Sequence, residues 1–364
     1  MRFQTGIRKR IGVRAAQLAL AVGLFLIPLL ALPFAISEAH RGHWEQLGLS
    51  KSLVRQIVVA SGVMPTIYAV AEGQGVFRST DNGMTWTPVN SGLPADYMGR
   101  LGVQCIAVDP HNPQVLFVGL DTVGRNISSL SASLYRSTDG GMSWQGLGRD
   151  LGGEEVRAIG IAPPMATITT TWVYAAVGAG LYVSADSGNS WTRLDWRGGE
   201  VRIPITTILV APGNVQVVYV GTAGGGVYKS VDGGLTWTAA NKGIETAHVL
   251  ALAMSPGTGD ILYAGTTLGL FSSTDEGASW QRQGERLGEQ AVYAVAVHPL
   301  DEKIVYIGLD GSGVLCSTDG GHTWAPAKRG LGHARVFALT IDPLLPSAIY
   351  AGTRDGVWCY VGTE

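Results

Sequence analysis

One eight-residue pattern recurs six times along this chain of 364 residues. Each copy reads Ser-x-Asp-x-Gly-x-x-Trp. The aspartate and tryptophan of the six copies are Asp81 and Trp86, Asp139 and Trp144, Asp186 and Trp191, Asp232 and Trp237, Asp275 and Trp280, and Asp319 and Trp324. Successive aspartates are 58, 47, 46, 43 and 44 residues apart. A period in the forties filled with short apolar runs is typical of β-propeller blades.

Two further apolar runs precede each copy and are predicted to be the inner strands of a blade. Seven innermost runs begin near Val54, Val103, Val156, Ile205, Val249, Val292 and Val336. The seventh repeat ends without a copy of the pattern, whereas His43–Leu49 matches the segment that comes after each repeated tryptophan. The chain is therefore predicted to be an all-β, seven-bladed propeller over 43–364. Its ring is closed by the N-terminal strand that contains Trp44, which leaves no exposed sheet edge.

The repeated residues are suited to a hairpin turn. The aspartate can accept backbone N–H bonds, the glycine supplies a positive φ, and the tryptophan buries apolar surface against the next sheet. Six equivalent aspartates cannot all belong to one catalytic pocket, so the prediction for these twelve residues is structural.

This pattern is the Asp box, and the array from about 43 to 360 resembles the Asp-box propeller families. These include sialidases, sortilin-type receptor domains, xyloglucan-degrading hydrolases and photosystem II assembly factors, which share the fold and differ in activity. The resemblance implies that ligands bind on the face opposite the boxes, which we call the ligand face. The assembly factors are the closest in architecture, since they are exported single propellers that bind membrane-protein intermediates without catalysis.

The N-terminus carries an export signal. Residues 1–14 hold five basic residues and no acid, 15–36 are almost entirely apolar, and 37–42 form a linker. Twenty-two residues are enough to span a bilayer as one transmembrane helix. Ala35-Ile36-Ser37 also fits cleavage of a signal peptide. Both alternatives place 1–14 in the cytoplasm and the propeller outside it, anchored in one case and secreted in the other.

Net charge and cysteine content exclude several functions. Without the basic tail, 21 Lys and Arg stand against 28 Asp and Glu, which argues against nucleic-acid binding. Cys105, Cys316 and Cys359 show no metal-ligand spacing and are predicted to be buried free thiols. No motif for a cofactor or a metal is present.

Glycoside hydrolysis needs two carboxyl groups across the scissile bond. The candidates on the ligand face are Asp121, Glu200, Asp310 and Asp355. Asp310 and Asp355 each precede glycine, as in ordinary turns, and the xyloglucan-degrading hydrolases pair two propellers. Arg202 stands in an Arg-Ile-Pro segment that resembles a sialidase element, but it follows the third box instead of preceding the first. The prediction is that the chain is not an enzyme.

Departures from the repeat indicate where a partner would bind. Extra residues from about Leu120 to Ser133 are predicted to project from the ligand face. Basic residues and one additional tryptophan gather near the connections between blades, namely Arg100, Arg157, Trp196, Arg197, Arg202, Lys328, Arg329 and Arg335. We expect a non-catalytic scaffold for a membrane-protein complex, with its ligand face held near the bilayer by the anchor. The alternatives are a glycan-active propeller, with Trp196 as an exposed platform, and a sortilin-type peptide receptor.

Overall fold

The computed structural model describes residues 43–361, except 63–64, 97, 123–131, 148–150, 152, 164–169, 197–202, 257–258, 285–286 and 328–329. The predicted tail, anchor or signal core, and linker at 1–42 lie outside the described residues. Among the residues that are described, no helix is long and apolar enough to cross a membrane.

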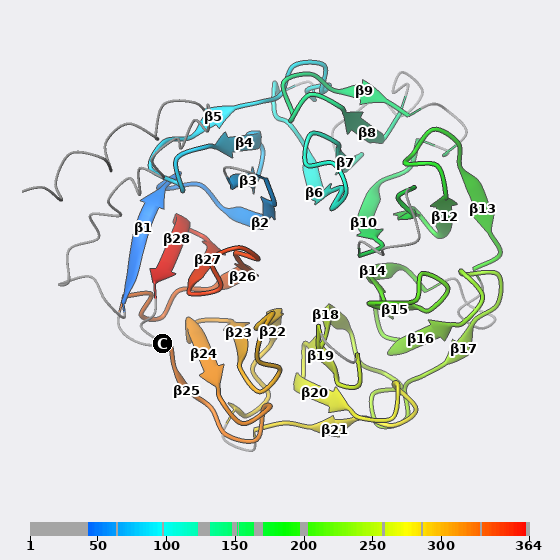
Figure 1. Ribbon diagram of the computed structural model, residues 1–364, viewed down its shortest axis with the longest axis vertical. Helices are drawn as coiled ribbons and strands as arrows, with labels where there is room; N and C mark the ends of the chain where they lie inside the picture. The colour runs from blue at the N-terminus through cyan, green and yellow to red at the C-terminus, as the bar shows by residue number, and fades with distance from the viewer. Residues whose placement is uncertain are drawn as a thin grey trace, which may run out of the picture. The chain divides into compact units, whose positions relative to one another are not determined.

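Seven antiparallel sheets of four strands stand in a ring (Figure 1). Blade 1 has β2 (Val54–Ala60), β3 (Thr66–Ala71), β4 (Gly75–Ser79) and β5 (Thr87–Pro88); blade 2 has β6 (Val103–Val108), β7 (Leu116–Leu120), β8 (Leu134–Ser137) and β9 (Gln145–Gly146). Blade 3 has β10 (Val156–Ile161), β11 (Val173–Val177), β12 (Gly180–Ser184) and β13 (Thr192–Leu194); blade 4 has β14 (Ile205–Val210), β15 (Val218–Thr222), β16 (Val227–Ser230) and β17 (Thr238–Ala239). Blade 5 has β18 (Val249–Met254), β19 (Leu262–Thr266), β20 (Gly269–Ser273) and β21 (Gln281–Arg282); blade 6 has β22 (Val292–Val297), β23 (Val305–Leu309), β24 (Val314–Ser317) and β25 (Ala325–Pro326). Blade 7 has β26 (Val336–Ile341), β27 (Ala348–Thr353), β28 (Gly356–Val361) and β1 (Trp44–Gly48), which confirms the predicted seven-bladed fold.

Strand direction gives the propeller two distinct faces. In blades 1 to 6 the loop after the first strand and the Asp-box hairpin after the third lie at the same end, because successive strands are antiparallel. Backbone bonds join these two loops: Gly140 N–H donates to Gln114 C=O and Gly320 N–H donates to Lys303 C=O, both at 2.9 Å. This end is the Asp-box face. The turns after the second strands and the connections between blades make up the opposite, ligand face.

The Asp box of blade 2 shows how the predicted turn is held. The Asp139 carboxylate accepts hydrogen bonds from the Ser137 hydroxyl (2.7 Å), the Ser143 N–H (2.9 Å) and the Ser143 hydroxyl (2.6 Å). The N–H of Gly141, at a φ of 85°, donates to the Ser137 hydroxyl oxygen at 2.8 Å. These are the hydrogen bonds expected from the structural role predicted for the box.

Because of these hydrogen bonds, we expect the folded propeller to lose stability in acid. The hydroxyl bonds from Ser143, Thr236 and Ser279 hold the pKa of Asp139, Asp232 and Asp275 at about 2. A carboxylate whose pKa is lower in the folded state stabilises the fold above its unfolded pKa of about 3.9, and this contribution is lost as pH falls through the folded value. We therefore expect the urea midpoint to be steady from pH 7 to 5 and to fall steeply between about pH 4 and 2. A flat profile in that range would contradict this role of the boxes.

Tryptophan and tyrosine side chains join neighbouring blades. Trp144 Nε1 donates to Val89 C=O of the preceding blade, and Trp280 Nε1 donates to Ala240 C=O, each at 2.8 Å. Trp237 and Trp324 instead donate within their own turns, and buried Trp191 Nε1 has no partner among the described residues. A second set of links was not predicted. Tyrosines of the second strands donate to the box turn of the following blade, as Tyr68 does to Gly140 C=O (3.0 Å).

The N-terminal strand closes the ring as predicted. β1 pairs with β28 in an antiparallel ladder, with Trp44 opposite Tyr360. The Trp44 side chain is only 3% exposed, and its Nε1 donates to Ala327 C=O of blade 6 at 2.8 Å. Trp44 thus occupies the place that an Asp-box tryptophan takes in the other blades.

The three cysteines are free thiols, in agreement with the prediction. Cys105 and Cys359 are buried, and desolvation raises the pKa of each thiol to about 12. Cys316 is only partly buried, so the prediction that all three are fully buried is wrong for this residue.

Candidate functional site

A β-bulge opens the innermost strand of every blade on the ligand face. In each blade the pairing register shifts between the first and third residues of this strand. A bulge re-aims the side chain of the extra residue. The seven bulge residues are Arg55, Gln104, Arg157, Thr206, Leu250, Tyr293 and Phe337. They lie at the ligand-face ends of the innermost strands of the ring, and we call them the inner-bulge residues (Figure 1).

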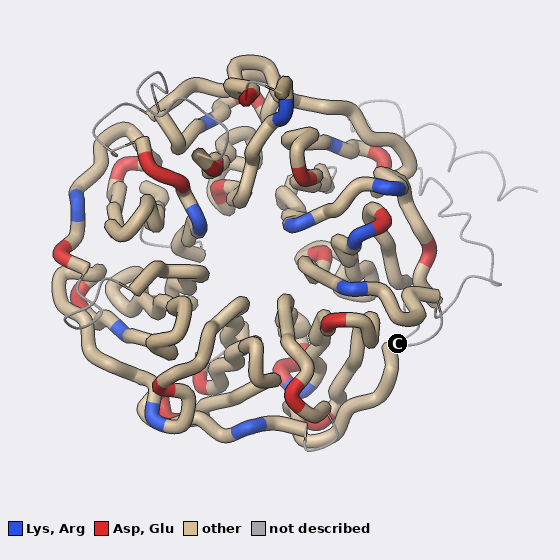
Figure 2. Tube along the Cα trace, turned by 180° about the vertical axis from the view of Figure 1, so that it is seen from behind, with Lys and Arg blue, Asp and Glu red and all other residues tan. Residues whose placement is uncertain are grey.

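The inner-bulge residues of blades 1 to 3 are polar. Arg55 forms an ion pair with Glu72 at 2.7 Å, and Gln104 Nε2 donates to the Asp121 carboxylate at 3.1 Å. Arg157 forms an ion pair with Glu155. In the described part of the chain, Lys and Arg positions are interspersed with Asp and Glu positions around the ring (Figure 2).

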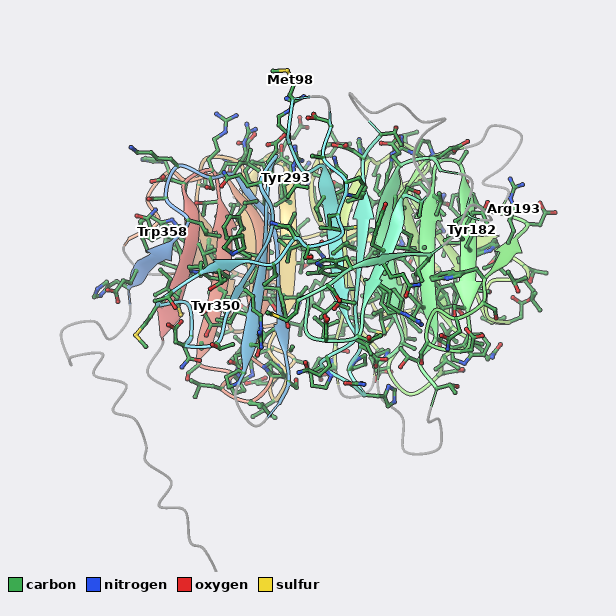
Figure 3. The ribbon with its side chains drawn as sticks, turned by 90° about the horizontal axis from the view of Figure 1, so that it is seen from above. Met98, Tyr182, Arg193, Tyr293, Tyr350 and Trp358 are labelled. Atoms are coloured by element: carbon green, nitrogen blue, oxygen red, sulfur yellow. The ribbon has the colours of Figure 1, made fainter. Side chains whose placement is uncertain are left out.

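The inner-bulge residues of blades 6 and 7 are aromatic. The rings of Tyr293 and Phe337, from blades 6 and 7, lie 5.6 Å apart at an interplanar angle of 58°. Arg335 Cζ lies 5.8 Å from the Tyr293 ring centroid and 5.9 Å from that of Phe337, within the range of a cation–π interaction. Tyr293 is seen in the half of the propeller that carries Met98 (Figure 3).

Arg335 also binds across the junction of blades 6 and 7. Its guanidinium forms a two-pronged ion pair with Asp310, which follows β23, and the Nη2 bond to Oδ2 measures 2.8 Å. Charge-assisted bonds of this kind are short and directional. The hydrogen bond to Asp310 raises the pKa of Arg335 still further, so the guanidinium stays charged at any pH at which the protein is folded.

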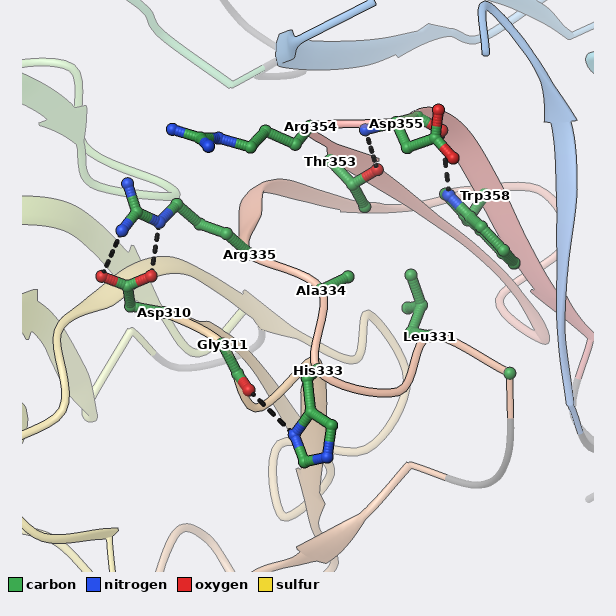
Figure 4. Close-up of a pocket in the computed structure, with 11 residues that line it drawn as sticks. Asp310, Gly311, Leu331, His333, Ala334, Arg335, Thr353, Arg354, Asp355 and Trp358 are labelled. Atoms are coloured by element: carbon green, nitrogen blue, oxygen red, sulfur yellow. Dashed lines mark hydrogen bonds and ion pairs between the residues drawn. The ribbon is translucent and has the colours of Figure 1, made fainter. Parts of the chain in front are cut away.

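A pocket of about 440 Å³ lies beside this ion pair on the ligand face, a volume typical of small-ligand sites (Figure 4). Its lining comes from the turn after β23, the connection before β26 and the turn after β27. The lining residues are Asp310, Gly311, Gly330, Leu331, His333, Ala334, Arg335, Thr353, Arg354, Asp355 and Trp358.

The turn that carries Arg354 is held firmly. Asp355 N–H donates to the Thr353 hydroxyl oxygen at 3.0 Å, its carboxylate accepts from Lys51 N–H at 2.7 Å, and its carbonyl accepts from Trp358 Nε1 at 3.3 Å. The Arg354 side chain is exposed and makes no ion pair within the described part of the chain. Arg335 and Arg354 extend toward the same side of the pocket (Figure 4). The backbone is thus fixed, while one guanidinium is available to a ligand.

The predicted binding residues lie in different parts of the protein. Arg335 lines the pocket, Arg157 is an inner-bulge residue, and Arg100 is exposed in an ion pair with Asp96 at 2.9 Å. Four predicted basic residues (Arg197, Arg202, Lys328 and Arg329) and the candidate carboxylate Glu200 lie outside the described residues. The same holds for 123–131 of the predicted binding loop; at its base, Leu120 N–H bonds to Ser133 C=O at 2.9 Å.

The prediction for Trp196 is wrong. This side chain is only 6% exposed, and its ring packs edge-on against Tyr228 and Trp237 at centroid distances of 5.2 and 5.3 Å. Trp196 fills the space between blades 3 and 4, so it cannot serve as an exposed platform.

Of the candidate carboxylates, Asp310 and Asp355 are brought to one pocket, while Asp121 belongs to blade 2. The sequence reasoning missed His333, Arg354 and Trp358. The available signal was their position next to Arg335 and Asp355 in the last repeat. Among the residues described here, no cluster of three or more His, Cys, Asp or Glu could hold a metal ion.

Residues 77–88 match the family model described as the BNR/Asp-box repeat, and the chain is a seven-bladed propeller built on that repeat. A xyloglucanase from a Paenibacillus species is 24% identical over 202 residues, which make up 53% of this chain and 19% of that relative. This chain therefore spans about a fifth of the curated relative that it matches.

Solved structures share the fold. The GH74 xyloglucanase from Xanthomonas campestris matches with a TM-score of 0.69 and 19% identity, over 88% of this chain and 53% of that chain. YCF48 bound to D1 peptide matches with a TM-score of 0.62 and 16% identity, over 88% of this chain and 97% of that chain.

The similarity to a xyloglucanase contradicts the expectation from the sequence that this chain is not an enzyme. That expectation rested on two arguments: Asp310 and Asp355 stand in turns, and xyloglucan-degrading hydrolases have two propellers. Neither argument excludes a hydrolytic site, because both carboxylates line one pocket.

Proposed function

We propose that this chain is an exported, membrane-attached propeller that binds a segment of a protein partner on its ligand face, at the pocket between blades 6 and 7. The observation that carries the proposal is Arg354, an exposed cation on a turn fixed by three hydrogen bonds, which lines one pocket with Arg335 and Trp358. Pre-organised arginine and aromatic groups are the side chains most often found at binding hot spots.

The comparison with YCF48 supports this proposal, because that protein is bound to a peptide and this chain covers nearly its whole length. The predicted apolar segment at 15–36 makes a subunit or an assembly intermediate of a membrane-protein complex the expected partner. Attachment to the same bilayer would raise the effective concentration of such a partner.

Site-specific photo-crosslinking tests the proposal. A photoreactive residue placed at His333 in the pocket is expected to capture one reproducible membrane-protein partner in native membranes. The same residue placed at Arg193, on β13 at the outer edge of blade 3, serves as the control (Figure 3). Equal capture at both positions, or none at His333, would contradict binding at the pocket.

A second candidate is glycoside hydrolysis at the same pocket, favoured by the xyloglucanase similarity and by the presence of Asp310 and Asp355 in one lining. One carboxyl group would protonate the leaving oxygen and the other would activate water or attack the sugar. Asp310→Asn and Asp355→Asn are each expected to lower the release of reducing sugar from xyloglucan about 10²- to 10⁴-fold, as loss of a general acid or base does. Asp260→Asn, an exposed change on the opposite face, is the control. Absence of hydrolysis by the unsubstituted protein would dismiss this candidate.

A further inference from the structure

The chain enters the propeller on the Asp-box face. β1 is the fourth strand of blade 7, and the fourth strand of every blade runs from the Asp-box face to the ligand face. His43 and Trp44 therefore lie at the Asp-box end. Residues 37–42 separate them from the predicted apolar segment, and six residues reach no more than about 20 Å even when fully extended.

Exposed apolar side chains gather on the same face. Among the described residues, nine large apolar side chains are strongly exposed, and only Met98 and Leu268 belong to the ligand face. The other seven lie in Asp boxes or in loops after first strands, namely Met84, Met142, Val231, Leu235, Leu300, Leu344 and Leu345. Five of these seven belong to blades 6, 7, 1 and 2, which surround the point of chain entry.

The arrangement of these seven residues favours a planar partner. They are distributed over blades 1, 2, 4, 6 and 7. A flat surface touches every protruding tip on one side of a disc at once. An apolar tip that reaches the boundary of headgroups and acyl chains leaves water, which stabilises the contact.

The charges on this face suit a zwitterionic surface. Each box aspartate is held by hydrogen bonds within its own turn, as Asp139 is by Ser137 and Ser143. Asp301 and Glu302 are exposed directly beside Leu300. Such carboxylates would repel anionic lipids, whereas phosphatidylcholine or phosphatidylethanolamine offers no net charge.

We propose that the Asp-box face is the membrane-facing surface of this protein, and that the seven apolar tips contact a zwitterionic bilayer. The ligand face and its pocket then point away from the membrane. The inference rests on the membrane attachment proposed above, and it reverses the expectation that an anchor would hold the ligand face near the bilayer. A partner must then present its segment about 20 Å or more above the membrane, since strands of five or six residues separate the two faces.

Fluorescence quenching in nanodiscs tests this orientation. The full chain is placed in phosphatidylcholine nanodiscs that contain spin-labelled lipid, with a fluorophore on a single exposed cysteine. Cys316→Ser provides the background, since Cys105 and Cys359 are buried. Met142→Cys reports on the Asp-box face and Met98→Cys on the ligand face. The two methionines are matched controls because they are 58% and 67% exposed. Met98 projects outward beyond the strands on its face (Figure 3).

We expect at least threefold stronger quenching at Met142→Cys than at Met98→Cys. The further changes Leu300→Gln and Leu344→Gln are expected to weaken the signal at Met142→Cys. Equal quenching at both positions, stronger quenching at Met98→Cys, or release of the full chain from membranes by carbonate would each overturn the proposal. Crosslinking from His333 does not depend on this orientation, so failure of the orientation and failure of partner binding are distinguishable.

Discussion

Replacing Trp44 by alanine is expected to lower the free energy of unfolding by about 3–5 kcal/mol, the usual cost of deleting a buried large aromatic side chain. Trp44 is 3% exposed, lies 5.5 Å from the Tyr360 ring and donates to Ala327 C=O of blade 6. The substitution removes all three contributions at the point where the two ends of the ring meet. For a domain of this size, the melting temperature should fall by roughly 5–10 °C.

Two variants make this expectation specific. Trp44→Phe keeps most of the apolar contact and leaves Ala327 C=O without its donor, which should cost about 1–3 kcal/mol. Trp358→Ala removes a tryptophan of the same blade that is only partly buried, so it should cost clearly less than Trp44→Ala. If Trp44→Ala and Trp358→Ala lower the free energy of unfolding by similar amounts, the contacts that close the ring stabilise the fold no more than other contacts of blade 7.

Arg354→Glu is expected to reduce recovery of the protein partner about 10- to 100-fold, with little change in melting temperature. Reversal of a charge at an interface costs several kcal/mol when the facing group is charged. The side chain is exposed and carries no ion pair among the described residues, so folding does not depend on it. Quantitative crosslinking from His333 in native membranes measures the effect.

Two controls accompany this variant. Arg193→Glu makes the same change of charge on β13, outside the pocket, and should leave recovery unchanged. Arg354→Lys keeps the charge and loses the planar fork, so it should be intermediate. Recovery that drops equally in the Arg354→Glu and Arg193→Glu variants would indicate a general effect of net charge and would contradict a role for the pocket.

The repeat made the architecture predictable. The blade number followed from six copies of one turn and seven innermost apolar runs. The closure by Trp44 followed from an additional strand before the first repeat. The box needs only local geometry, so the roles of its Ser, Asp and Gly could be derived from sequence spacing. The links from second-strand tyrosines to the following blade could not be derived, because they depend on how neighbouring sheets are rotated.

The candidate site was only partly predictable for a related reason. Spacing placed Arg335, Asp310 and Asp355 on the ligand face, yet only the packing of blade 6 against blade 7 shows that they share a pocket with Arg354. Trp196 illustrates the opposite error. A tryptophan outside the repeat pattern looked exposed, but an irregular connection can fold back and fill the gap between two sheets.

The closure by β1 also determines the order in which this protein can fold. β1 is the first of the described strands to be synthesised and pairs with β28, the last of them, while the Trp44–Ala327 bond joins residues 283 positions apart. Blades 1 to 6 can form as the chain emerges, whereas blade 7 must wait until β28 has been synthesised. During that interval β1 has an unpaired edge, and contacts of such long sequence separation form slowly. The nascent chain is thus most prone to aggregate through β1, until β1 pairs with β28.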